Sequence, residues 1–277
     1  MCLILFSFDP DSNTPLILGA NRDEFFHRPT APAHFWEDHS QVLAGRDLQA
    51  GGTWLGISRE GRFAGITNVR EPGVVVENAR SRGELTKDFL AGDLSPVDYL
   101  RQVESKQTQY SGFNLLLGDF SKFRPCLHYF SNREADPQKK GPQRLNAGTY
   151  GLSNHLLDSP WPKVDDGKQS LIAGLKKARG DHKSIRQLLE NSSLADDHRL
   201  PETGLDYDKE KALSAIFIML PDYGTRASTV ISINQQHIEF SEQNYAASQT
   251  GQANRDGETS HFIIDRSVIS PKTVAAK

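Results

Sequence analysis

Cysteine is scarce in this sequence, and so are long apolar segments. Two cysteines, Cys2 and Cys126, are too few for a disulfide framework. No run approaches the ~18 apolar residues that a membrane-spanning helix needs, so we expect no transmembrane segment. Residues 1–8 have neither a basic region nor a small-residue cleavage site, and we expect no secretory signal peptide. These absences predict a soluble, reduced, cytoplasmic protein.

Neither sign of charge dominates the chain. The 32 basic and 35 acidic side chains leave a net charge of −3, which argues against nucleic acid as a partner. The sequence also lacks a phosphate loop, a G-x-G-x-x-G run and a C-x-x-C-H motif, and the last absence excludes covalent haem attachment. His27, His34 and His39 fall in a loop-like stretch without the spacing of a zinc site, and we expect no metal.

Hydrophobic periodicity and turn residues predict a mixture of strands and helices. Strands are expected at residues 3–8, 16–20, 54–58, 62–68, 113–120, 126–130, 215–220, 228–233, 237–240 and 262–264. Helices are expected at residues 83–90, from Pro96 with Ser95 as N-cap, at 165–179, and after a capping box that starts at Ser184. Cys126 should be a buried small side chain in its strand. Residues 196–207 are expected to be a loop, and residues 243–260 to be polar and mobile.

The order of these elements, strands then helices in alternating blocks, predicts an α+β fold. Two sheets that pack face to face, with helices on the outside, would bury every apolar face in a four-layer αββα sandwich. Such an arrangement suits a reactive residue on a central strand.

Cys2 is the first candidate site residue. If Met1 is removed, Cys2 carries both a thiol nucleophile and a free α-amine. The amine has an ordinary pKa of about 7.7–8.0, which suits a general base at neutral pH. The strand at residues 3–8 would hold this terminus in place. The alternative is that Cys2 merely follows the start codon.

A polar quartet, NRDE at residues 21–24, directly follows the second expected strand and therefore lies near Cys2. Asp23 is expected to hold the α-amine of Cys2. Arg22 is expected to lower the pKa of the thiol or to bind an acidic group of a substrate. The alternative is a turn that carries a surface ion pair.

Asn68 and Asn154 are candidate oxyanion donors, because amide N–H groups stabilise the charge that develops during acyl transfer. Arg226 opens an expected strand and is a candidate to clamp a carboxylate or to stabilise developing charge. Each of the three also has an ordinary structural interpretation, as a turn residue or a surface cation.

The run NRDEFFHRP at residues 21–29 resembles the signature of the NRDE family, which is the Transport and Golgi Organization protein family. Matching blocks follow as GGTWLGIS at 51–58, TN at 67–68, RGEL at 82–85, GFNL at 112–115, GTYGLSN at 148–154 and YGTR at 223–226. The resemblance spans residues 1–265, which implies one domain followed by a tail at 266–277.

That family is similar in turn to N-terminal nucleophile (Ntn) hydrolases of the N-terminal-cysteine type, which cleave bile-salt and penicillin amides. The resemblance implies an Ntn-hydrolase-like αββα fold. It also implies that Cys2 is the nucleophile, that Asp23 orients its amine, that Asn68 and Asn154 form the oxyanion hole, and that Arg226 supports the charge. One departure stands out: those hydrolases carry an arginine where this sequence has an alanine, directly before the NRDE run.

The family resemblance implies a role in intracellular haem trafficking, with haem as a transported ligand rather than a catalytic cofactor. Cys2, His27 and His155 are the candidate axial ligands. Residues expected to contact a small-molecule ligand are Asn21, Arg22, Glu24, Trp54, His27 and His155. Two alternatives stay open: a cysteine amidase that uses Cys2, and a non-catalytic lipid- or acyl-coenzyme A-binding module.

Overall fold

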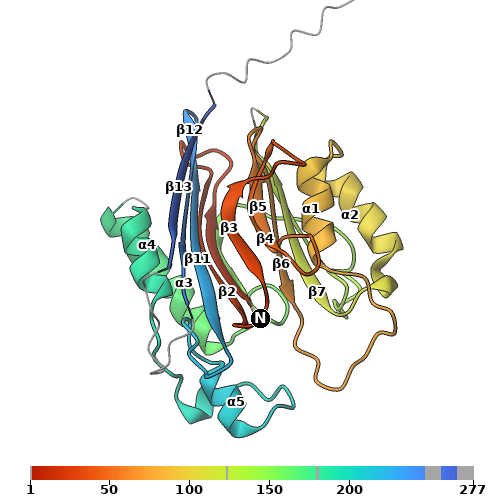
Figure 1. Cartoon of the computed structure of the whole chain (residues 1–277), viewed down its shortest axis with the longest axis vertical. Helices are drawn as coiled ribbons and strands as arrows, with labels where there is room; N and C mark the ends of the chain where they lie inside the picture. The colour runs from red at the N-terminus through yellow and green to blue at the C-terminus, as the bar shows by residue number, and fades with distance from the viewer. Residues whose placement is uncertain (1, 123, 179–180, 247–256, 267–277) are drawn as a thin grey trace, which may run out of the picture.

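The computed structural model describes residues 2–122, 124–178, 181–246 and 257–266. Two sheets face each other at the centre, and helices cover the outer face of each (Figure 1). The four-layer αββα arrangement expected from the order of the elements is therefore confirmed. None of the helices in these residues is long and apolar enough to cross a membrane.

The first sheet has six antiparallel strands and includes the N-terminal strand. In spatial order they are β10 (Gly148–Leu152), β1 (Cys2–Phe8), β2 (Leu16–Phe25), β11 (Tyr223–Ile233), β12 (His237–Asn244) and β13 (Thr259–Asp265). Because β10 and β2 flank β1, the strand that begins at Cys2 is hydrogen-bonded on both sides.

The second sheet has seven antiparallel strands in sequence order. They are β3 (Thr30–Phe35), β4 (Val42–Asp47), β5 (Leu55–Ser58), β6 (Arg62–Asn68), β7 (Phe113–Asp119), β8 (Cys126–Ser131) and β9 (Gln143–Arg144). This order is a meander, which needs only short connections except where helices intervene between β6 and β7.

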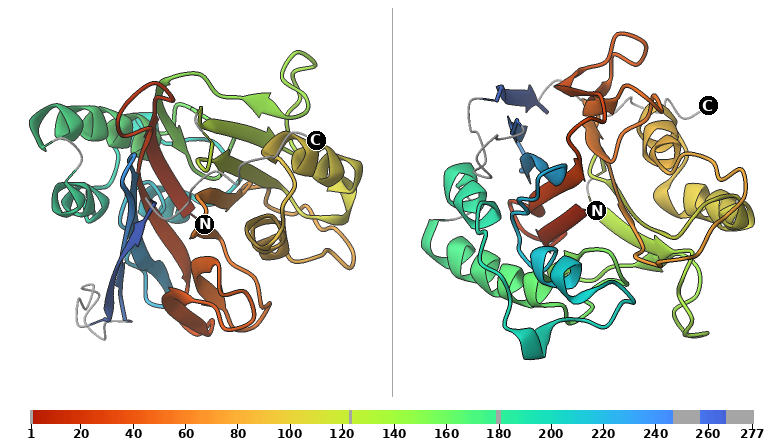
Figure 2. Two further views of the ribbon diagram at one scale, coloured as in Figure 1. Left: turned by 90° about the horizontal axis from the view of Figure 1, so that it is seen from above. Right: turned by 60° about the horizontal axis from the view of Figure 1, so that its bottom comes forward.

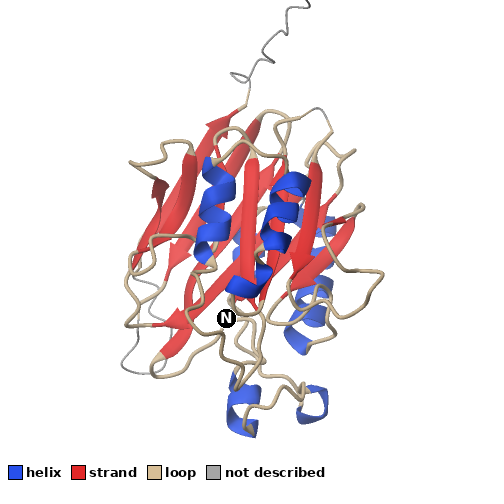
Figure 3. Ribbon diagram, turned by 90° about the vertical axis from the view of Figure 1, so that its right-hand side faces the viewer, coloured by secondary structure: helices blue, strands red, loops and turns tan. Residues whose placement is uncertain are grey.

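Each sheet has a pair of helices on its outer face. The second sheet is covered by α1 (Gly83–Ala91) and α2 (Pro96–Ser105), which Figure 3 shows in front of the strands. The first sheet is covered by α3 (Pro162–Ala178) and α4 (His182–Leu189). A short helix, α5 (Tyr207–Ala212), and two 3₁₀ turns, Gln107–Gln109 and Asp197–Arg199, complete the set described.

Alternation along β1 shows how the sequence separates the layers. Ile4 and Phe6 point into the apolar core between the two sheets, whereas Leu3 and Leu5 pack beneath α3 and α4. Successive side chains of a strand point to opposite faces. Cys2 therefore shares the face of Ile4 and looks into the space between the sheets.

The polar quartet at residues 21–24 lies inside β2 and not after it, which corrects the sequence interpretation. Asn21 pairs with Leu3 of β1 and with Ser228 of β11, so the strand continues through it. Polar side chains normally end a strand, but here β1 pairs with β2 as far as Arg22, and β11 pairs with it as far as Phe25.

The predicted strand at residues 215–220 is also wrong. The side chains of residues 215–218 are buried as expected, but Met219 is exposed and is the only residue of the segment that forms a bridge, with Gly224. The backbone of this segment bonds partly to loop carbonyls, as from the Phe217 N–H to Asn191, and partly to side chains. Thr225 Oγ1 accepts from the N–H of Ile218, and the amide of Asn21 donates to the carbonyl of Ile216. Its apolar residues therefore enter the core without a ladder of strand hydrogen bonds.

Four smaller expectations are corrected. The histidine-containing stretch is not all loop, since β3 contains His34. The N-cap of α4 is Asp181, whose side chain accepts from the Ser184 N–H, so Ser184 lies within the helix. Cys126 is only partly buried. The segment at residues 196–207 contains a 3₁₀ turn.

The expected mobile segment at residues 243–260 begins within β12 and ends within β13. Its residues 247–256, like the expected tail beyond residue 266, lie outside the described residues. The Ser95 N-cap is confirmed, because its side chain accepts from the Asp98 N–H.

Candidate functional site

Cys2 and Arg22 are directly opposite each other on neighbouring strands, β1 and β2. Residues opposite each other in a ladder point to the same face, so both side chains enter the space between the sheets. Figure 2 shows the N-terminal end of the chain at the centre of the molecule, between the two layers. The strand pairing thus brings an arginine beside the thiol.

This end of the sandwich holds a cavity of about 540 Å³. Seven of the predicted site residues line it: Cys2, Arg22, Asp23, Glu24, Trp54, Asn68 and Arg226. Cys2 is 9% exposed, and that exposure is into the cavity. The volume falls within the ~300–1,000 Å³ of typical small-molecule sites.

Burial raises the pKa of the Cys2 thiol above its ordinary value. The Asp23 carboxylate acts in the same direction, whereas the Arg22 guanidinium and the backbone N–H of Asp23 favour the thiolate. The predicted effect of Arg22 on the thiol is therefore present, but burial outweighs it. A base near the sulfur is needed to form the nucleophilic thiolate at neutral pH.

Asp23 lies on the other face of β2, toward the helices, and only 1% of it is exposed. Thr225 Oγ1 donates to Asp23 Oδ1 at 2.8 Å, and the Tyr223 hydroxyl donates to the Asp23 carbonyl at 3.0 Å. Burial raises the pKa of the carboxyl; the charge of Lys163 and the bond from Thr225 oppose that rise. Asp23 is thus fixed behind the Cys2–Arg22 pair.

Arg226 occupies a β-bulge in β11. Thr225 pairs with Asp23 and Ala227 pairs with Arg22, so Arg226 has no partner in β2. A bulge re-aims the extra residue and leaves it out of the ladder. The Arg226 guanidinium donates to the carbonyls of Phe25 and Arg28, at 2.9 and 3.1 Å.

Asn68 and Asn154, the two predicted oxyanion donors, are brought together. Asn154 Nδ2 donates to the Asn68 carbonyl at 3.0 Å, and the N–H of Arg70 donates to the Asn154 carbonyl at 2.7 Å. Asn68 lines the cavity, whereas Asn154 is fully buried behind it. Their role as oxyanion donors stays a prediction.

Besides Asn154, three predicted residues do not line the cavity. Asn21 is fully buried on the helix side, where it donates to the carbonyls of Leu189 and Ile216. These bonds tie β2 to the helical layer. His27 and His155 are exposed: the ring of His27 lies against Phe25, and His155 shares a hydrogen bond with Ser159.

Arginines that sequence reasoning missed add positive charge to the cavity wall: Arg28, Arg80 and Arg82. Arg28 is paired with Asp47 at 2.7 Å. Arg82 donates to the carbonyl of Gly112 at 3.0 Å and lies close enough to Cys2 for their charges to interact. The RGEL block contained Arg82, but nothing in its spacing indicated a neighbour of Cys2.

The cavity wall also contains Glu242, which sequence reasoning missed as well. Its carboxylate accepts from the Ala33 N–H at 2.8 Å and from Thr229 Oγ1 at 3.1 Å. Because Ala33 is in β3 and Glu242 in β12, this buried carboxylate ties one sheet to the other. Burial raises its pKa.

Lys163 is the third missed feature. It is the second residue of α3 and only 3% exposed, and its Nζ has no hydrogen-bond partner among the described residues. Within the same residues, no cluster of three or more His, Cys, Asp or Glu side chains is arranged to hold a metal ion.

Known proteins resemble the chain over nearly its whole length. A family model described as Transport and Golgi organisation 2 matches residues 1–247. The Transport and Golgi organization protein 2 homolog of Bos taurus is 38% identical over 266 residues, covering 90% of this chain and 94% of the relative. The Homo sapiens homolog is 37% identical over 260 residues, covering 87% and 92%. The Drosophila melanogaster protein is 28% identical over 277 residues, covering 86% and 89%.

Solved structures with a similar arrangement are more distant. The Caenorhabditis elegans ortholog of N-acylethanolamine-hydrolyzing acid amidase has a TM-score of 0.44 at 13% identity, covering 83% of this chain and 92% of the other. A mutant conjugated bile acid hydrolase from Clostridium perfringens has a TM-score of 0.38 at 12% identity, covering 95% and 96%. At these values, neither likeness assigns an activity to this chain.

Proposed function

The chain belongs to the Transport and Golgi organisation 2 family, and from that premise we propose that it is a cysteine hydrolase that cleaves an amide bond of a small anionic molecule. The observation that carries the proposal is the position of Cys2 on the cavity wall, with Arg22 beside it and Asp23 behind it.

The residues suit a two-step acyl transfer. Once Met1 is removed, the α-amine of Cys2 takes the thiol proton, and the thiolate attacks the substrate carbonyl. The amides of Asn68 and Asn154 stabilise the oxyanion. The protonated amine then gives its proton to the leaving nitrogen, and water hydrolyses the thioester to regenerate Cys2. Asp23 holds the amine during both transfers.

The arginines account for the expected charge of the substrate. Arg82 and Arg226 bond to main-chain carbonyls, and Arg22 Nη1 has no hydrogen-bond partner within the described residues. Guanidinium groups bind carboxylates and phosphates in a two-pronged geometry. A substrate with such a group near its amide bond matches this cavity. A reducing compartment such as the cytoplasm would keep the thiol free for this reaction.

Haem binding is the second candidate, and the same cavity supports it. Cys2 is the expected axial ligand that lines the cavity, because His27 and His155 are exposed elsewhere. A thiolate is an established haem ligand type, and Arg82 and Arg226 would pair with the propionates. In this function the protein binds and releases haem without chemical change.

Cys2→Ala is the variant that tests the proposal. The intact mass of protein purified from its own cells first shows whether Met1 is removed. We then expect Cys2→Ala to lose hydrolysis of an acidic acyl-amide panel by at least ~10³-fold, because the nucleophile is gone. Cys126→Ala is the matched control and should keep full activity.

Either of two results contradicts the hydrolase: retained Met1, or equal turnover by the Cys2→Ala and wild-type proteins. A haem titration then decides the second candidate. A Soret shift in wild type that Cys2→Ala weakens supports haem binding, and unchanged spectra at micromolar protein exclude it. Acyl-coenzyme A binding that survives in Cys2→Ala would instead indicate the non-catalytic binding module.

A further inference from the structure

Lys163 occupies a position that packing alone does not explain. It lies in the first turn of α3, where the aligned peptide dipoles disfavour a positive charge. It is almost fully buried, and its Nζ lacks a hydrogen-bond acceptor among the described residues. A buried donor without an acceptor destabilises a fold. The side chain is therefore a candidate for a role at the neighbouring site.

Charged and titratable groups of four other segments face this amine. They are Asp23 from β2, Cys2 from β1, Arg70 just after β6 and Glu210 from α5. Glu210 is already engaged, since it pairs with Arg70 at 2.6 Å and accepts from the Thr203 N–H at 3.1 Å. The principal anion left to Lys163 is thus Asp23, on the helix-facing side of β2.

We propose that Lys163 is a positioning residue that keeps Asp23 ionised, so that this carboxylate holds the amine of Cys2 for proton transfer. The inference rests on the proposed function, because it assigns a partner to the residue that orients the nucleophile. It adds a member to the site from the helical layer, on the opposite face of the sheet from the cavity.

The titration properties of the two side chains agree with this role. Burial raises the pKa of Asp23, and the Lys163 charge is the first influence that opposes the rise. Burial lowers the pKa of Lys163 to about 8, and the negative charge of Asp23 is the largest influence that opposes this lowering. Each charge therefore stabilises the other, and at neutral pH most of the lysine remains protonated.

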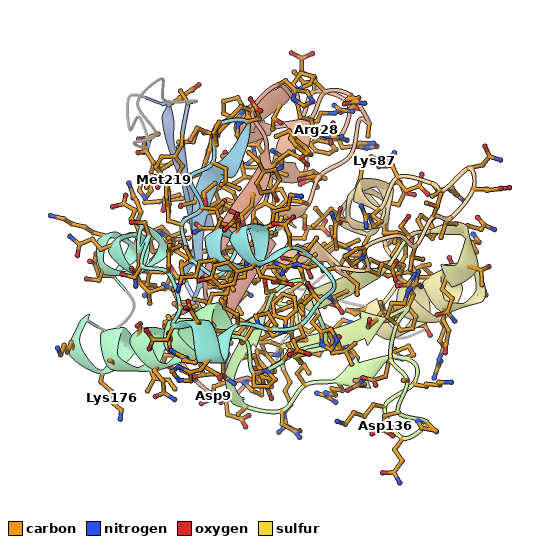
Figure 4. All side chains as sticks on the ribbon, turned by 90° about the horizontal axis from the view of Figure 1, so that it is seen from below. Asp9, Arg28, Lys87, Asp136, Lys176 and Met219 are labelled. Carbon is orange, nitrogen blue, oxygen red and sulfur yellow. The ribbon has the colours of Figure 1, made fainter. Side chains whose placement is uncertain are left out.

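The test measures the pKa of Asp23 directly. The carboxyl carbon of Asp23 is followed by ¹³C NMR against pH and assigned by comparison with Asp23→Asn. In Lys163→Met we expect the midpoint to rise by about one pH unit or more, a tenfold change in the ionisation constant. Lys163→Arg, which keeps the positive charge, should restore the wild-type midpoint of Asp23. Lys176→Met, on the exposed end of the same helix and labelled in Figure 4, should leave it unchanged.

Equal Asp23 midpoints in folded Lys163→Met and wild type would overturn the inference. If Lys163→Met does not fold, the pKa of Lys163 is measured instead, in wild type and in Asp23→Asn. Loss of the carboxylate should lower the pKa of Lys163, and an unchanged value would overturn the inference as well. Neither titration uses a substrate, so a failure of the hydrolase proposal through Cys2→Ala remains a separate result.

Discussion

At the scale of single residues, Arg22 and Asp23 are neighbours in sequence whose side chains lie on opposite faces of one sheet. Arg22 points into the cavity beside Cys2, whereas Asp23 points toward α3 and bonds to Thr225. The alternation of a strand allows this division only because β2 continues through both residues. β2 therefore holds both groups: it pairs with β1 at Cys2 and with β11 at Asp23.

Lys163 leads to a prediction for stability against pH. Its folded pKa of about 8 lies below the ordinary value of 10.5, because burial disfavours the charge. Burial of the charged lysine therefore destabilises the folded protein. This cost is fully present below pH 8 and is relieved as the pH rises from 8 to 10.5. In that window the unfolding free energy of wild type should gain about 1.4 kcal/mol per pH unit relative to Lys163→Met.

Urea unfolding at several pH values, with both proteins measured in parallel, gives this difference. Groups that titrate in both proteins cancel in the comparison. Lys176→Met serves as the exposed control and should follow wild type at every pH. Parallel curves for wild type and Lys163→Met would contradict the lowered pKa.

Sequence reasoning found Cys2, Arg22 and Asp23 because a nucleophile and its partners are recognisable residue types in a recognisable run. It missed Lys163 because a lysine after Pro162 is typical of an exposed first turn of a helix. Its burial depends on how α3 packs against β1 and β10, and no local pattern encodes that contact. Arg82 was missed because its position beside Cys2 likewise depends on packing that no local pattern encodes.

At the scale of elements, the sequence misplaced the start of one helix, missed the strands β3, β4, β9 and β10, and predicted one strand that is absent. The expected capping box at Ser184 placed the start of α4 three residues late, because Asp181 has the same capping chemistry and lies first. The strand at residues 215–220 failed for a different reason. Its apolar run encodes burial, but side chains of Asn21 and Thr225 take the backbone bonds.

Asp181→Ala tests the start of α4. We expect it to lower the unfolding free energy by about 1 kcal/mol, because the Ser184 N–H loses its acceptor. Asp181→Asn keeps a capping oxygen and should stay near wild type. Chemical denaturation of the variants provides the measurement. A larger loss in Ser184→Ala than in Asp181→Ala would restore the capping box of the sequence interpretation.

At the scale of the whole molecule, the order of the strands and helices predicted the layers. What the sequence did not reveal is how the sheets are joined at the cavity. Glu242 crosses from β12 to the backbone of β3, and only the packed sandwich brings those strands together. The site is therefore a product of sheet packing as much as of the NRDE run.

The core between the sheets should dominate stability. Ile238 in β12 is fully buried there, whereas Ile263 in the neighbouring β13 is 64% exposed. We expect Ile238→Ala to cost about 2–5 kcal/mol of unfolding free energy, because it leaves a cavity. Ile263→Ala should change it by no more than about 0.5 kcal/mol. Equilibrium unfolding in urea measures both, and similar losses would argue against the assignment of the core.

The bulge at Arg226 also determines which genetic changes the site tolerates. A substitution at this codon alters one side chain on the cavity wall. An in-frame deletion instead removes the extra residue of the bulge and makes the pairing of β11 with β2 regular. Thr225 and Ala227 then become consecutive residues opposite Asp23 and Arg22, so Thr225 still faces Asp23 and Ser228 still faces Asn21. Missense and deletion alleles of the same codon therefore differ: the first replaces the guanidinium, and the second removes both the guanidinium and the bulge that aims it into the cavity.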